Sequence, residues 1–254
     1  MISAARSLVV YHTSDVHARL GFGALVARTA EPGSLLVDCG DSLRGSSTLF
    51  FRDEPVTSEF AAAPYRAQAV GNREFHYVHR WFLSRARMQP MPMICSNLVD
   101  LRSRAAPFSR ELHVDVDGVR VRLLAALTPQ YRTGSGWERI FGWRFLAPAE
   151  ALAEMLAQGR ARSTPTPDAT ILLSHLGLDA DRKIAQAFPH LSAIVGGHSH
   201  ETLAQPEIVG GVPIAHAGPF AQYLGRLELR VAPASSKAQF ISFRLLPLLA
   251  KNGA

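Results

Sequence analysis

Seven residues of the chain carry oxygen or nitrogen side chains of the kinds that bind metal ions, and each follows a short apolar run. Two divalent ions about 3.5 to 4 Å apart need one carboxylate that bridges them and about three further ligands each. Mixed ligation by imidazole and carboxylate suits Mn, Fe, Zn or Co better than Mg or Ca. The residue types therefore predict a site for two divalent ions, with one ligand shared, built from Asp15, His17, Asp41, Asn72, His175, His198 and His200.

The apolar runs before these residues are predicted to be strands. Short strands that alternate with helix-period segments are typical of an α/β fold, in which sites form at the carboxyl ends of the strands. We therefore expect the seven residues to meet at one edge of the sheet system. The predicted strands of this kind are residues 8–12, 35–37, 67–70, 93–95, 171–173 and 193–195.

Antiparallel strands are expected to join this system. Hairpin turns are predicted at Asp117-Gly118 and at Gly210-Gly211, because such pairs adopt the positive φ angles of two-residue turns. Helices are expected from Pro148 onward and over about 179–188. No internal repeat and no linker divides the sequence, so residues 1–254 are expected to form a single domain. The remaining predicted strands are 112–117, 119–125, 224–231 and 240–245.

The composition is that of an ordinary globular protein. The chain has 254 residues, of which 47% are hydrophobic, and this excludes disordered and collagen-like classes. Its 27 Lys plus Arg against 21 Asp plus Glu suit an anionic substrate or nucleic acid, although a solvated basic surface is favoured.

Cysteine content and apolar runs bear on location. Cys39 and Cys95 cannot build a disulfide framework, and we interpret them as buried structural thiols in a reducing compartment. Before Tyr11 only Leu8, Val9 and Val10 form an apolar run, far short of the roughly 7 to 15 residues of a signal-peptide core. No run approaches the roughly 18 apolar residues of a membrane span. We therefore expect a cytoplasmic protein with no membrane partner.

Five short blocks around the candidate ligands resemble the signature blocks of the calcineurin-like metallophosphoesterases. The flanking residues resemble the 5′-nucleotidase branch of that family, and the match runs from about residue 8 to residue 231. In order along the chain the blocks are Asp15-Val16-His17, Gly40-Asp41-Ser42, Gly71-Asn72, Ser174-His175 and Gly197-His198-Ser199-His200.

This resemblance implies a four-layer α-β-β-α sandwich with two mixed sheets. It implies that Asp15, His17 and His200 hold one ion, that Asn72, His175 and His198 hold the other, and that Asp41 bridges both. It also implies hydrolysis of phosphate monoesters or diesters, with nucleotides among the candidates, by a two-metal-activated hydroxide. The expected cofactors are thus two divalent metal ions, and the expected partner is a small phosphorylated substrate.

The sequence departs from the branch in two places that affect catalysis and substrate binding. Arg73 stands where the branch normally has His, and His76 stands where it normally has Asp, a pair associated with the leaving group. Arg73 cannot supply a proton at workable pH, but its planar fork can hold phosphate oxygens, so it is predicted to clamp substrate. A salt bridge that faces away from the metals is the alternative for Arg73. His76 is the candidate proton donor, with packing as its alternative.

Three further interpretations remain open at this point. His216 follows a predicted strand, and substrate binding, metal ligation, orientation of a ligand and plain packing are all considered for it. Relatives in this branch usually carry a second, C-terminal domain that clamps the nucleoside base, and we expect no such domain here. The competing functions are a nuclease of the same superfamily, which the basic charge would suit, and a metal-binding protein with lost catalysis.

Overall fold

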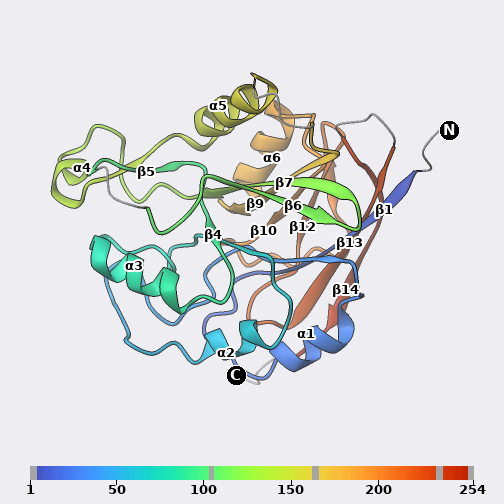
Figure 1. Cartoon of the computed structure of the whole chain (residues 1–254), viewed down its shortest axis with the longest axis horizontal. Coiled ribbons are helices and arrows are strands. Elements are labelled where there is room, and N and C mark those ends of the chain that lie inside the picture. The colour runs from blue at the N-terminus through green and yellow to red at the C-terminus, as the bar shows by residue number, and fades with distance from the viewer. Residues whose placement is uncertain (1–4, 103–105, 162–165, 233–236, 251–254) are drawn as a thin grey trace.

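Two six-stranded mixed sheets face each other in the computed structural model, with helices on their outer sides (Figure 1). The structure describes residues 5–102, 106–161, 166–232 and 237–250. Within these ranges, no helix combines the length and the apolar character needed to cross a bilayer. Two facing sheets with helices on their outer sides make an α-β-β-α sandwich, so the expected architecture is confirmed.

The first sheet holds the strands that lead to the amino-terminal candidate ligands. β1 pairs in parallel with β2 and antiparallel with β13, so one sheet combines both pairing types. In spatial order its strands are β14 (Gln239–Pro247), β13 (Tyr223–Val231), β1 (Arg6–Thr13), β2 (Leu35–Asp38), β3 (Ala67–Ala69) and β4 (Met93–Ile94).

The second sheet holds the strands that lead to the histidines of the carboxyl-terminal half. Its centre is parallel, and each edge is an antiparallel hairpin. In spatial order its strands are β11 (Glu207–Val209), β12 (Val212–His216), β10 (Ala193–Gly196), β9 (Ala169–His175), β7 (Val119–Leu127) and β6 (Glu111–Val116).

The layers follow from the alternation of apolar side chains along buried strands. In β2, Leu35 and Val37 face the other sheet, whereas Leu36 faces the outer helices. In β9, Ile171 and Leu173 likewise face inward and Leu172 faces outward. Because successive strand residues point to opposite faces, a strand that is apolar throughout must be covered on both sides. The core therefore lies between the sheets and is bounded by two outer helical layers.

The outer layers differ in their helices. α1 (Gly23–Thr29) and α2 (Val56–Ala61) pack on the first sheet through a cluster that includes Val26, Phe60 and Leu36. α5 (Pro148–Ala161) and α6 (Leu178–Ala187) cover the second sheet through Leu152 and Ile184.

An aromatic cluster fills one end of the sandwich, next to the outer edge of β4, which Ser109 covers. It packs α3 (His79–Met88) against a small antiparallel pair of β5 (Leu98–Asp100) and β8 (Trp143–Phe145), with α4 (Gly136–Phe141) beside them. Trp143 is fully buried there, with its ring stacked on His79 at 5.2 Å. Sequence reasoning did not predict this lobe, because strands of three residues are too short to show a period.

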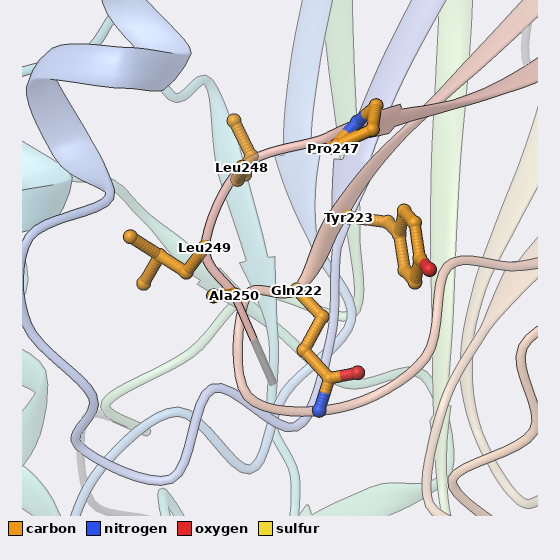
Figure 2. Close-up of a pocket in the computed structure, with 6 residues that line it drawn as sticks. All are labelled: Gln222, Tyr223, Pro247, Leu248, Leu249 and Ala250. Carbon is orange, nitrogen blue, oxygen red and sulfur yellow. The ribbon is translucent and has the colours of Figure 1, made fainter. Parts of the chain in front are cut away.

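The chain after β14 turns back along the first sheet. Leu248 and Leu249 pack against the cluster under α1 and α2, and the amide of Leu248 donates to the carbonyl of Gln222 over 2.9 Å. Figure 2 shows the pocket of about 240 Å³ that this segment forms with Gln222 and Tyr223. None of the seven candidate ligands lines this pocket, so it is separate from the predicted site.

Candidate metal centre

The sheet registers bring the candidate ligands to the carboxyl ends of neighbouring parallel strands. In the first sheet Thr13 pairs with Asp38 and Asp38 pairs with Gln68, so the segments after β1, β2 and β3 begin at one level. In the second sheet Ser174 pairs with Gly196, so β9 and β10 also end together. The site therefore forms at one edge of the sandwich, between loops from both sheets.

The ligand loops bend sharply as they leave the strands. Asp15, His17, Asp41, His198 and His200 all have positive φ angles, at 50°, 51°, 58°, 75° and 62° respectively. Residues with side chains rarely adopt this conformation, and it clusters at functional sites, where the surrounding structure holds it. Cross-loop hydrogen bonds hold it here, since Asp15 N donates to Gly40 O at 2.9 Å and His17 N to Asp41 O at 3.0 Å.

Asp15, His17 and His200 form the first ligand group. One ligand atom from each lies within 4.8 Å of the others. Nε2 of His17 lies 2.9 Å from Nε2 of His200, and the latter lies 3.5 Å from Oδ1 of Asp15. Two imidazole nitrogens and a buried carboxylate oxygen directed at one point are a donor set that suits a transition-metal dication. The first group therefore fits a metal ion.

Asp15, Asp41 and His175 form the second ligand group. Nε2 of His175 lies 3.2 Å from Oδ1 of Asp41, and both side chains are nearly or fully buried. His175 Nδ1 lies 2.9 Å from the carbonyl oxygen of Cys39, a contact that needs the proton on Nδ1. Nε2 then faces the carboxylates, and in the neutral ring it carries the lone pair that a metal ion needs. The shared member of the two groups is Asp15, whereas the sequence predicts Asp41 as the bridge.

His198 and Asn72 flank these groups. The amide of His198 donates to both carboxylate oxygens of Asp15, at 3.0 and 3.2 Å, and its ring packs edge-on against His175 at 5.0 Å. Oδ1 of Asn72 accepts a hydrogen bond from Nε2 of Gln130 at 3.0 Å. All seven predicted ligands are thus at the same edge of the sandwich.

The electrostatics of the metal-free site separate carboxylates from imidazoles. Burial lowers the pKa of His17 to about 4, with a further contribution from the Arg73 guanidinium. Burial also lowers the pKa of His175, but the carboxylates of Asp41 and Asp15 outweigh it and raise the value to about 9. Burial raises the pKa of Asp41, but His175 outweighs it and holds the value well below the usual range. The site therefore gathers ionised carboxylates, which attract a cation.

Arg73 lies beside Asp41 of the second ligand group. Its amide donates to Oδ1 of Asp41 at 2.8 Å, and its Nη1 donates to the carbonyl of Leu43 at 3.2 Å. Within the described parts of the chain no carboxylate pairs with its guanidinium, so the salt bridge considered above is not observed. The Arg73 side chain therefore stays available for an anion.

His76 and His216 are both buried, and each has a hydrogen-bond partner within the protein. Nδ1 of His76 accepts from the amide of Val78 at 3.0 Å, and its ring meets Phe50 edge-on at 6.4 Å. Nε2 of His216 lies 2.8 Å from Oδ2 of Asp181, and neither side chain is exposed. A fully buried ring cannot contact a dissolved substrate, so this placement indicates packing and support of Asp181 rather than substrate binding by His216.

Sequence reasoning missed three residues at this centre. The carboxylate of Glu74 accepts backbone amides from Gly71, Asp41, Ser42 and Leu43 over 2.7 to 3.2 Å, and so joins two ligand loops. Gln130 and Phe220 are the others. Gln130 could have been suspected because it closely follows a predicted strand, but no local pattern marks Phe220.

Comparison with known proteins gives a metallophosphoesterase and 5′-nucleotidases among the relatives. No family model matches the chain. It is 24% identical to the 5′-nucleotidase of Vibrio cholerae over 292 residues, which covers 96% of this chain and 52% of that protein. The chain spans about a third to a half of the length of the first curated relatives it matches.

Solved structures agree with this relationship. A 5′-nucleotidase precursor from Thermus thermophilus superposes with a TM-score of 0.77 at 22% identity, over 96% of this chain and 55% of that one. The calcineurin-like phosphoesterase YfkN from Bacillus subtilis superposes with a TM-score of 0.74 at 19% identity, over 96% and 92%. The chain thus has the fold of the calcineurin-like phosphoesterases, and its curated relatives include a metallophosphoesterase and 5′-nucleotidases.

Proposed function

We propose that the chain is a metal-dependent phosphoesterase that holds two divalent ions and hydrolyses phosphate monoesters or diesters. The observation that carries this proposal is the pair of ligand groups that share Asp15 and draw on both sheets. Imidazole nitrogens 2.9 Å apart and buried, ionised carboxylates are a poor arrangement without a cation and a good one around it.

The residues that would hold the ions follow from the two groups. Asp15, His17 and His200 would hold one ion, and Asp41, His175, His198 and Asn72 would complete the second, with Mn, Fe, Zn or Co as candidates. When bound, such ions neutralise charge on phosphoryl oxygens and lower the pKa of water. The prediction from the sequence that Asp41 bridges the two ions is part of this proposal. Asp15, which belongs to both groups, is the alternative bridge.

The remaining residues orient these ligands and the substrate. Cys39 accepts the Nδ1 proton of His175 and so favours the tautomer that presents Nε2, and Gln130 fixes the Asn72 side chain by donating to its Oδ1. Arg73 is proposed to hold the nonreacting phosphate oxygens through guanidinium nitrogens that the carbonyl of Leu43 leaves free.

The substrate class proposed is small phosphorylated molecules, with nucleotides among them. The relatives named above are 5′-nucleotidases and phosphoesterases, which supports this class over nucleic acid. No observation in the site favours a nuclease, and the complete ligand set speaks against decay to a binding protein. A cytoplasmic location remains a prediction from the sequence.

Metal analysis and a substrate panel test this function. Purified protein is stripped with chelator, reloaded with Mn, Zn, Mg or Co in turn, and assayed on an aryl phosphate monoester, an aryl diester and a set of nucleotides. We expect about two ions per chain and turnover that chelation abolishes. Turnover that survives complete removal of metal, or two bound ions with no turnover on any ester, would contradict the proposal.

A further inference from the structure

Phe220 occupies an unusual position for a large aromatic residue. Its ring lies against both imidazoles of the first ligand group, with centroid distances of 5.3 Å to His17 and 5.9 Å to His200. Its side chain nevertheless remains solvent-accessible, since the residue is 38% exposed. An apolar surface therefore borders the candidate metal centre directly.

The backbone at Phe220 is held in a strained conformation. Its φ angle is 61°, in the left-handed region that bulky residues rarely adopt. Its amide donates to the carbonyl of Asp15 at 2.8 Å, and its own carbonyl accepts from Nη1 of Arg19 at 2.9 Å. Arg19 also donates to the carbonyl of Ala250 at 2.5 Å, so the loop after β1 holds this turn and is itself tied to the segment after β14. Strain that is held by several contacts beside a site points to a functional position.

Burial of hydrophobic surface does not explain this position. The neighbouring Ala221 is 1% exposed and already closes the core below the turn. Phe220 itself keeps 38% of its surface exposed beside the two imidazoles. The exposed ring therefore borders the position at which the first ion would be held.

We infer that Phe220 forms a subsite for the leaving group of the substrate and favours esters with an aromatic or other flat apolar group. This inference rests on the proposed function and deepens it by naming the substrate class. The exposed part of the ring offers an aryl group an edge-to-face or offset contact, while the ions and Arg73 hold the phosphoryl group. Arg73 and Phe220 then divide recognition between the charged and the apolar ends of one ester.

An alternative role for Phe220 is to position His17 and His200 by packing. The two roles differ in what a substitution changes. Loss of a subsite weakens only ligands that carry an aryl group, whereas loss of a positioning contact lowers metal affinity and weakens all phosphoryl ligands equally.

Binding of two nonhydrolysable anions separates these roles without turnover. Phenylphosphonate and methylphosphonate are titrated calorimetrically into Mn-loaded protein, and bound Mn is counted for each variant. The variants are Phe220→Leu, which keeps apolar bulk, Phe220→Trp, which keeps an aromatic face, and Trp137→Leu, which removes an exposed aromatic from α4 as a matched control.

We expect wild type, Phe220→Trp and Trp137→Leu to prefer phenylphosphonate by about three- to tenfold, as one aromatic contact provides. In Phe220→Leu the preference should disappear while methylphosphonate binding and Mn content stay unchanged. A preference that survives in Phe220→Leu, equal binding of both anions by wild type, or an equal loss of both with reduced Mn would overturn the inference. If neither anion binds wild type, the proposed function fails and this inference fails with it.

Discussion

Nδ1 of His175 lies 2.9 Å from the carbonyl oxygen of Cys39, across two strands that belong to different sheets. This contact fixes the tautomer of a fully buried histidine and directs Nε2 toward the carboxylates. Cys39, which precedes the Gly40-Asp41 turn, therefore orients a candidate ligand through its backbone carbonyl. Cys39 acts through its backbone, and its buried thiol fits the structural interpretation made from the sequence.

Asp15→Asn and Asp41→Asn test which carboxylate bridges the ions. Each substitution removes one negative charge, and removal of the bridging one should release both ions, whereas removal of the other should release one. Metal counting by mass spectrometry, together with kcat, distinguishes the two. We expect turnover to fall by at least about a hundredfold in either variant. Asp53→Asn, an exposed aspartate on the loop after Asp41, is the control and should keep both ions and normal turnover.

Glu74→Gln tests how the ligand loops are held together. The carboxylate accepts four backbone amides, and an amide side chain would turn an N–H toward some of these donors. We expect the free energy of unfolding to fall by about 1 to 3 kcal/mol and metal affinity to fall by about 10- to 100-fold. Denaturant titration and metal titration measure the two effects. Unchanged values, as expected for the exposed control Glu150→Gln, would remove Glu74 from this role.

His12 should make the fold sensitive to acid. Its ring is fully buried, and within the described residues neither nitrogen has a hydrogen-bond partner. Burial lowers its pKa to about 3, with a further contribution from His216. Because an unfolded histidine protonates near pH 6.5, the unfolded state binds more protons in this window. Stability is therefore lost as pH falls from about 6.5 toward about 3, by at most about 5 kcal/mol.

The variant His12→Leu should lose this dependence. Chemical denaturation at pH 7, 6, 5 and 4 measures the free energy of unfolding. This free energy should fall with pH in wild type and fall less steeply in His12→Leu. His113→Leu, at a half-exposed histidine on β6, is the control and should follow wild type. Parallel curves for wild type and His12→Leu would show that His12 does not control acid stability.

Arg73 and His76 are tested through the leaving group. Arg73 cannot donate a proton at workable pH, and general acid catalysis is worth about 10² to 10⁴ in rate. We therefore expect kcat/KM to rise steeply as leaving-group pKa falls, and Arg73→His to flatten this dependence. His76→Ala should leave the slope unchanged, because His76 is 4% exposed and packs on Phe50. A slope that steepens in His76→Ala would instead make His76 the proton donor.

Much of the architecture follows from local sequence pattern. The hairpin at Asp117-Gly118 forms between β6 and β7, with φ angles of 48° and 77° at its two turn residues. The second hairpin turns at Gly210-Gly211, as predicted, between β11 and β12. Both turns could be predicted because positive φ is a local requirement that Gly and Asp satisfy.

The structure brings the candidate ligands together, whereas the residues that support them carry no comparable signal in the sequence. The sequence could indicate Asp15, Asp41 and His175 because each stands at or just after the end of a predicted strand. Glu74 and Phe220 depend on contacts between loops that are 31 or more residues apart, as in the bonds from the Leu43 and Asp41 amides to Glu74. No local period encodes such contacts, and His216 shows the converse, because a strand-end histidine can be turned into the core by a carboxylate on a neighbouring helix.

The division of each ligand group between the two sheets has a mechanical consequence. Asp15 and Asp41 follow strands of the first sheet, and His175 and His200 follow strands of the second, so a bound ion would cross-link the two halves of the sandwich. Neither sheet alone presents a complete group. Ion binding would then be linked to folding of the sandwich. An ion at a hundred times its Kd would add about 2.7 kcal/mol to the free energy of unfolding. Loss of metal would therefore lower the stability of the sandwich as well as inactivate the site.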